Sequence, residues 1–292
     1  MSVITPKLPR HVVEQARIRI RKRAIHHQLL ALAAGKSERL SLDLGERGVD
    51  VAAAVLRASS GFEPESLEMQ RLRYVFHVSG TTEAVIDGLA ARDLHRRARS
   101  ARLVGALRLE ESVAWVAPLL ASRETSVAEA AARALGRIGG IRSAEALLAA
   151  VEHAGPRRVL ITELSRAAPD LFVEAALAGS QRPGVMAAAG VAAGLRRRQT
   201  GVGPLLTLLT TGNRRQRVIS SRALGWIGAR TAIPVIGLAL QDRQWRVRMS
   251  AAKALGTLQA RGCRPDLERL LLDRNPRVRK AAAYALRRLE QR

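Results

Sequence analysis

Apolar positions recur with a helical period over residues 241–259, which read QDRQWRVRMSAAKALGTLQ. At 100° per residue the apolar side chains fall within a sector of about 100°, the stripe of an amphipathic helix that faces a core. The stripe consists of Val247, Ala251, Ala254, Leu255 and Leu258. Arg246 and Lys253 point the opposite way, and Arg248 lies on a flank. The pattern predicts a helix with one buried face and one basic, outward face.

A closely similar sequence recurs over residues 272–290, LDRNPRVRKAAAYALRRLE. A glycine near the end of the helix marks the repeat, and Arg287 takes that position in the last copy. The marked glycines are Gly105, Gly136, Gly194, Gly225 and Gly256. The marked positions recur about every 31 residues, a period that is typical of solenoids. Only the interval from Gly136 to Gly194 is nearly twice as long, because it contains a degenerate copy around Leu164.

Each copy also carries an apolar segment upstream of this helix, and in several copies a proline stands near its start. These prolines are Pro118, Pro204, Pro234 and Pro265. Proline is tolerated in a first helical turn, because the N–H it lacks would be unpaired there. Each repeat is therefore predicted to consist of helix A, a short turn and helix B. Neither helix buries its apolar stripe alone, so stacking of repeats supplies the core.

The expected fold is all-α, an α-solenoid or superhelix of stacked two-helix repeats with a divergent N-terminal helical cap. Residues 82–292 are predicted to form the array, with about seven helix pairs. Residues 1–81 do not fit the repeat and are predicted to be a basic helical cap that shields the end of the core.

The segments DRQWRVRMSAAKALGTL and DRNPRVRKAAAYALRRL resemble the D-x-x-x-x-V-R-x-x-A-A-x-A-L-G core of HEAT repeats, of the short bacterial kind also called PBS-lyase-like. The resemblance implies an Asp–Arg ladder that ties successive turns together. Asp242 with Arg248, and Asp273 with Arg279, match that pair. Residue 211 is Thr and residue 184 is Gly, so the ladder is expected to stop there.

Charge adds a candidate surface to this fold. The net charge is +24, and residues 201–292 alone hold 19 basic and 5 acidic residues, or +14. Such an excess favours an acidic partner. Outward positions on successive helices B form basic rows, which we predict to bind that partner. The rows are Arg215, Arg246 and Arg277, then Arg222, Lys253 and Tyr284, with Arg102 and Arg133 in the second row's position in earlier repeats.

A second basic segment lies near the N-terminus, in RIRIRKR at 17–23. It is a candidate arm for an anionic surface, either lipid or nucleic acid, and consists of Arg17, Arg19, Arg21, Lys22 and Arg23. The layout resembles bacterial HEAT-repeat proteins with an N-terminal membrane anchor and a basic juxtamembrane segment. This sequence has no such anchor, so we expect a soluble relative or a natural start further upstream. A single cysteine, Cys263, favours a reducing compartment, hence the cytoplasm or the periphery of the inner membrane.

Catalytic signatures are missing from the sequence. It contains no phosphate-binding loop, nucleophile elbow or HExxH motif, and no His pairs with another His or Cys at helical spacing. No metal, cofactor or small-molecule substrate is predicted. Trp115, Trp226 and Trp245 occupy different repeat positions, so packing in the core or between repeats is the expected role.

The first functional hypothesis is a non-catalytic scaffold that binds a protein with an acidic face through the basic surface of helices B. The second is sequence-independent binding to the phosphate backbone of nucleic acid by the Arg-rich C-terminal repeats. The third is peripheral association with an anionic membrane through the N-terminal basic helix. An enzyme, either an alkylbase DNA glycosylase or a bilin lyase, is the last alternative, because fold does not imply function.

Overall fold

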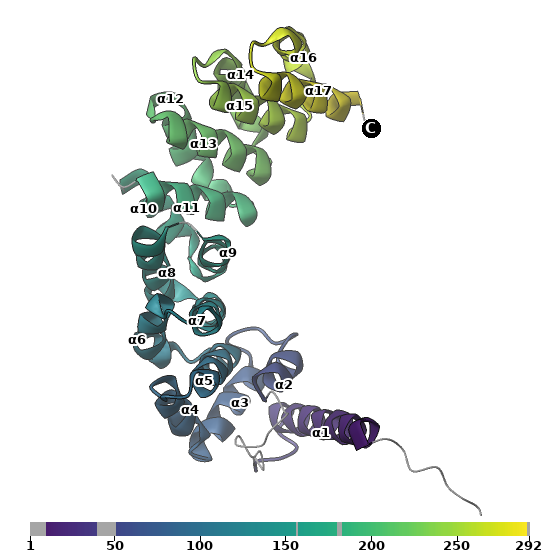
Figure 1. The fold of residues 1–292 in the computed structure, drawn as a ribbon, viewed down its shortest axis with the longest axis vertical. Helices are drawn as coiled ribbons and strands as arrows, with labels where there is room; N and C mark the ends of the chain where they lie inside the picture. Colours follow the sequence, from purple (N-terminus) through teal and green to yellow (C-terminus); the bar gives the residue numbers. More distant parts are fainter. Residues whose placement is uncertain (1–9, 40–50, 156, 180–182, 291–292) are drawn as a thin grey trace, which may run out of the picture. The chain divides into compact units, whose positions relative to one another are not determined.

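The computed structural model describes residues 10–39, 51–155, 157–179 and 183–290. Over these residues the regular elements are α-helices and short 3-10 helices, which confirms the predicted all-α class. The internal contacts divide the chain into two units, Met1–Ile138 and Gly139–Arg292, which are described separately (Figure 1). The predicted boundary between residues 81 and 82 falls inside the first unit, next to the start of α4, and stays a prediction.

The first unit begins with α1, α2 and α3, which span Arg10–Ala33, Val51–Ala58 and Leu67–Val78. They pack around fully buried side chains such as Leu29, Leu72 and Phe76. Two helix pairs follow, and their helices B, α5 and α7, stack directly on each other. The pairs are α4 (Thr81–Leu89) with α5 (Leu94–Leu107), and α6 (Val113–Val116) and η2 (Ala117–Ala121) with α7 (Thr125–Ile138).

The second unit is a stack of helix pairs, as Figure 1 shows. The first pairs are α8 (Gly140–Ala154) with α9 (Arg158–Ala167), α10 (Asp170–Gly179) with α11 (Pro183–Leu195), and α12 (Val202–Thr211) with α13 (Arg214–Ile227). The last two have a broken helix A: α14 (Ile233–Leu238) and η5 (Ala239–Gln241) pair with α15 (Trp245–Thr257), and α16 (Arg264–Arg269) and η7 (Leu270–Leu272) with α17 (Pro276–Glu290). Successive helices B contact each other along the stack.

The apolar stripe predicted for α15 is its buried face. Val247, Ala251 and Leu255 are fully buried, and Ala254 and Leu258 are nearly so. Because several of these side chains are alanines, the neighbouring helices B approach closely. The core of the unit is therefore continuous from repeat to repeat, as stacking requires.

The glycine that marks the repeat lies where the next helix B crosses. A Cβ added at Gly256 would lie 2.7 Å from the Cα of Ala285 in α17, and one at Gly225 would lie 3.0 Å from the Cα of Ala254 in α15. Gly105 of the first unit faces Ala134 of α7 in the same way. The recurrence of these three glycines thus has a steric cause, because the backbones of neighbouring helices B approach closely at this point.

Helices B end in a left-handed turn three residues beyond this position. Gly228 has φ 81°, but Gln259 and Arg108 occupy the equivalent place with φ 51° and 53°. The N–H of the following Ala260 donates to the carbonyl of Leu255 at 3.0 Å, the bond of a Schellman motif. This turn sends the chain back into the next helix A.

Candidate binding groove of the second unit

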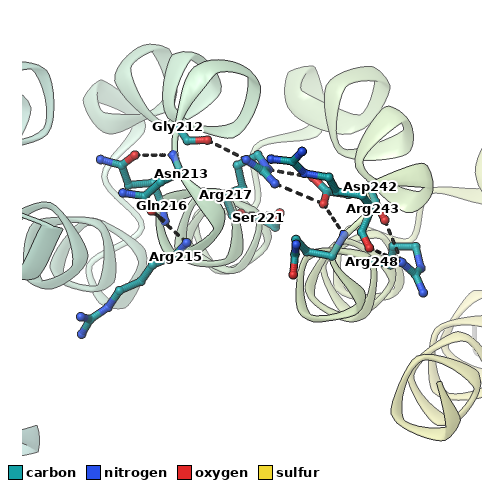
Figure 2. Close-up of polar contacts among 10 residues, drawn as sticks. Gly212, Asn213, Arg215, Gln216, Arg217, Ser221, Asp242, Arg243 and Arg248 are labelled. Atoms are coloured by element: carbon teal, nitrogen blue, oxygen red, sulfur yellow. Dashed lines mark hydrogen bonds and ion pairs between the residues drawn. The ribbon is translucent and has the colours of Figure 1, made fainter.

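Two arginine–aspartate pairs join successive repeats of the second unit. Arg217 of α13 donates from Nε to Asp242 Oδ2 at 2.7 Å and from Nη2 to Oδ1 at 3.2 Å. Arg248 of α15 makes the same bidentate contact with Asp273, at 2.7 and 2.9 Å. Figure 2 shows the Arg217 guanidinium between the carbonyl of Gly212 and the Asp242 carboxylate. These pairs form a ladder along one edge of the stack.

The ladder runs one repeat further than the sequence predicted. Arg248 reaches Asp242 of its own repeat only through the backbone carbonyl, at 2.8 Å, and its carboxylate partner belongs to the next repeat. Arg217 was not among the predicted ladder residues, yet it belongs to the ladder because Asp242 supplies its carboxylate. The threonine at position 211, where later repeats have aspartate, therefore does not exclude Arg217 from the ladder. The signal that could have found Arg217 is that it occupies the position of Arg248 in the preceding repeat.

The last ladder arginine, Arg279, has a different set of partners. It was predicted to pair with Asp273, but its Nη1 donates to the backbone carbonyls of Asp273 and Arg274, at 2.9 and 3.3 Å. The Asp273 carboxylate binds Arg248 instead, and these hydrogen bonds are the main reason that the pKa of Asp273 is lowered. The Arg279 side chain thus hydrogen-bonds to the backbone carbonyl of Asp273 and not to its carboxylate.

A groove of about 550 Å³ lies between α13, α15 and the start of α17. Four cationic side chains line it: Arg222, Arg246, Lys253 and Arg277, which we call the groove cations. The sequence placed all of them on the outward face, and the structure brings them to one groove. No acidic residue is among the residues that line it.

Two tryptophans line the same groove as these cations and contact neighbouring repeats, which is one of the two roles expected from the sequence. Trp226 at the end of α13 is exposed, and Trp245 at the start of α15 is half-buried. Trp115 is 52% exposed, so it is not part of the core. Different repeat positions did not keep Trp226 and Trp245 apart, because the groove runs along α13 and α15 and the two rings line different stretches of it.

Guanidinium groups lie over both indole rings. The guanidinium carbon of Arg222 is 4.9 Å from the centroid of the Trp226 ring. Arg246 and Arg277 lie 4.6 and 5.4 Å from the centroid of Trp245. At these distances the negative face of the ring attracts the cation. The rings therefore hold three of the groove cations in place.

The other residues predicted to bind a partner do not line this groove. Arg215 is exposed and extends away from the ladder in Figure 2, and Tyr284 is exposed on α17. In the first unit, Arg133 pairs with Glu129 at 2.7 Å, and Arg102 is half-buried in α5. The predicted basic row is thus concentrated in the last repeats.

The predicted N-terminal arm lies on α1. Arg19, Arg21, Lys22 and Arg23 are exposed there, and the Arg17 side chain lies outside the described residues. At 100° per residue the four exposed cations spread over about 200° of the helix circumference, whereas a helix that lies on a membrane gathers its cations on one face. Among the described helices none has the length and apolar character that a membrane span needs.

Candidate chemistry elsewhere is sparse in the part of the chain that the structure describes. No group of three or more His, Cys, Asp or Glu side chains is placed there to hold a metal ion. Burial raises the pKa of the Cys263 thiol, and the nearby Asp266 raises it further. A raised thiol pKa is the opposite of what an activated cysteine needs.

Family models match two parts of the chain. The model described as HEAT repeats matches residues 234–292, and the PBS lyase HEAT-like repeat matches residues 127–153. Both matched parts are HEAT repeats, which supports a HEAT-repeat protein family for this chain. The first match covers α15 and α17, which line part of the groove, whereas α13 lies outside it. Proteins built from such repeats are scaffolds whose extended surfaces commonly bind other proteins.

Similarities to solved structures are low. Human deoxyhypusine hydroxylase in complex with glycerol is 18% identical, with 95% of this HEAT-repeat chain and 99% of that chain covered, at a TM-score of 0.38. A designed armadillo repeat protein is 17% identical, with 70% and 98% covered, at a TM-score of 0.32. Neither similarity carries information on activity or ligand. No curated protein sequence matches this chain.

Proposed function

We propose that this HEAT-repeat protein is a non-catalytic scaffold that binds a protein partner with an acidic face through the helix-B surface of its last repeats. The observation that carries the proposal is a groove lined by four cationic side chains and no acidic one. Arginine forks match the geometry of carboxylates, so such a surface selects acidic partners and speeds their approach.

The contrast with the ladder supports a binding role for the groove cations. Arg217 and Arg248 each have a carboxylate partner within the fold. In the described residues, no carboxylate forms an ion pair with Arg222, Arg246, Lys253 or Arg277. Four like charges close together repel each other, which lowers the stability of the free protein. An acidic partner would offset this repulsion when it binds.

The composition of the groove also supports a non-catalytic role. A glycosylase-like site needs a carboxylate beside its paired aromatics, and the lining residues include no Asp or Glu. They include no His or Cys for proton transfer or nucleophilic attack either. The groove offers cations and indole rings, which suit binding.

The test is a triple charge reversal of groove cations, Arg222→Glu, Arg246→Glu and Arg277→Glu. A partner captured from cells of the source organism is identified by mass spectrometry, purified and titrated against wild type and variant. Reversal is expected to abolish binding while the far-UV circular dichroism spectrum stays unchanged. The matched control reverses three exposed arginines outside the groove, Arg230, Arg243 and Arg274, and is expected to bind as wild type. Wild-type affinity in the first triple variant contradicts the proposal.

Nucleic acid is the second candidate, because the groove cations repeat along the stack. Arg222 and Lys253 occupy the same position of successive repeats, and so do Arg246 and Arg277. Binding to phosphates releases counterions, so affinity would fall steeply as salt rises. A gel-shift titration with single- and double-stranded DNA at low salt tests this candidate, and the absence of any shift removes it.

A further inference from the structure

Both indole rings of the groove have guanidinium groups over them. Arg246 of α15 and Arg277 of α17 both lie over Trp245, so this ring joins two successive repeats through two positive charges. Arg222 lies over Trp226 within its own helix. A base that stacks on an indole needs a free ring face. The geometry therefore favours recognition of anions by guanidinium groups over stacking of bases on tryptophan.

The backbone positions of the groove cations have a regular spacing. Arg222 and Lys253 stand in the same position of successive helices B, as do Arg246 and Arg277, and neighbouring helices lie about 10 Å apart. Along α15, Arg246 and Lys253 are seven residues apart, which is also about 10 Å at about 1.5 Å per residue. The backbone positions of the groove cations therefore form a lattice with a spacing of about 10 Å, both along a helix and between neighbouring helices.

This spacing matches one kind of acidic ligand. An extended peptide in the polyproline II conformation has three residues per turn and advances about 3.1 Å per residue, so every third side chain points the same way at intervals of about 9 Å. Side chains at every third position thus present carboxylates at the period of the lattice. Consecutive acidic residues point in three directions around such a chain, so only about one in three of them would face the groove.

We propose that the groove binds an acidic segment of a protein partner in the extended polyproline II conformation, with carboxylates at every third residue. Arg222, Arg246, Lys253 and Arg277 bind the carboxylates, while Trp226 and Trp245 hold the three guanidinium groups in position. The proposal rests on the proposed function, since it names the ligand of the same surface. What it adds is the spacing of the ligand's charges and a positioning role for the two tryptophans.

Two synthetic peptides of equal composition test the spacing. Both consist of glycine, serine and glutamate and carry a fluorescent label. One has a glutamate at every third position, and the other has its glutamates in one block. Fluorescence anisotropy with the full chain at low salt is expected to give the spaced peptide about tenfold tighter binding, since one further well-placed charged hydrogen bond contributes about that much. Equal affinities overturn the spacing.

Substitution of Trp245 tests the positioning role. Trp245→Leu keeps every charge but removes the ring under Arg246 and Arg277, and is expected to weaken binding of the spaced peptide about threefold to tenfold. Trp245→Phe keeps a smaller ring and is expected to give an intermediate affinity. Trp115→Leu is the matched control, an exposed tryptophan of the first unit, and is expected to bind as wild type. Wild-type affinity in Trp245→Leu overturns the positioning role.

A third probe decides the class of ligand. A labelled oligothymidylate strand presents phosphates and bases to the same protein under the same salt. Tighter binding of this strand than of the spaced peptide, with a loss on Trp245→Leu, overturns the acidic-peptide proposal in favour of single-stranded nucleic acid.

The outcomes separate this inference from the proposed function. If the triple charge reversal abolishes binding of the partner but both peptides bind alike, only the spacing fails. If the triple variant still binds its partner at wild-type affinity, the proposed function fails, whatever the peptides do.

Discussion

Arg248 and Asp273, on successive repeats, face each other with both N–H···O bonds formed, at 2.7 and 2.9 Å, and little of either side chain exposed. Asp273 also accepts a hydrogen bond from the backbone N–H of Asn275 at 2.8 Å, just before α17. One carboxylate thus fixes both the stacking of α15 on its neighbour and the start of the next helix B. The ladder is a structural device, distinct from the groove cations.

Asp273→Asn is expected to lower the free energy of unfolding by about 2 kcal/mol, because a charged, bidentate contact is lost and Arg248 keeps no carboxylate partner. The measurement is urea unfolding followed by circular dichroism. Asp266→Asn removes an exposed pair with Arg269 and serves as the control, with almost no change expected. A loss equal to that of the control would show that the ladder does not stabilise the stack.

The same pair predicts a pH dependence. The hydrogen bonds from Arg248 lower the pKa of Asp273 in the folded protein. The carboxylate therefore contributes its full stability above its unfolded pKa of about 3.9 and loses it as the pH falls below that value through the lowered folded pKa. The difference in stability between wild type and Asp273→Asn is expected to be constant near neutral pH and to shrink below about pH 4. A difference that grows in acid contradicts this assignment.

Gly256→Ala is expected to destabilise the second unit by about 2 kcal/mol, because the new methyl group would meet the backbone of Ala285. Gly203→Ala is the matched control. Gly203 lies in α12 with no atom near its added Cβ, so alanine is expected to stabilise by up to about 1 kcal/mol through its better helix propensity. Thermal unfolding of both variants measures the two effects. Stability changes of the same sign in the two variants would refute the steric role of the repeat glycine.

Gln259→Gly is expected to raise stability by about 1 kcal/mol, because Gln259 adopts a left-handed conformation that glycine adopts without steric cost. Gly228 occupies the equivalent turn one repeat earlier, so Gly228→Ala is expected to have the opposite sign. Chemical denaturation of the two variants checks this pair. A loss of stability in Gln259→Gly would mean that its side chain makes a contribution larger than the backbone strain.

Moderate salt is expected to stabilise the free protein. The chain carries a net charge of +24, and its groove cations have no carboxylate partner among the described residues. Between about 0.01 and 0.1 M salt the screening length falls from about 30 to about 10 Å, which weakens this repulsion more than it weakens the partly buried ladder. The midpoint of thermal unfolding should rise over this range, and less so in Arg246→Gln with Arg277→Gln. A falling midpoint would mean that attractive pairs dominate.

The sequence alone determined the parts of this protein that depend on neighbouring repeats in a regular way. The apolar stripe of α15 and the glycine opposite Ala285 both follow from the period of the repeat. In a stacked array each repeat contacts chiefly the one before and the one after, so a period in the sequence is also a period in the contacts. The outward placement of Arg246 and Lys253 followed from the same helical geometry.

Only the tertiary structure decided which side chains meet across repeats. Arg217 pairs with Asp242, which belongs to the following repeat and not to the repeat of Arg217. Trp226 and Trp245 share a groove although their repeat positions differ, since one ends α13 and the other begins α15. Periodicity fixes which face of a helix a residue occupies. It does not fix how two helices lie against each other along their length, and that arrangement brought Trp245 beneath Arg277 of the next repeat.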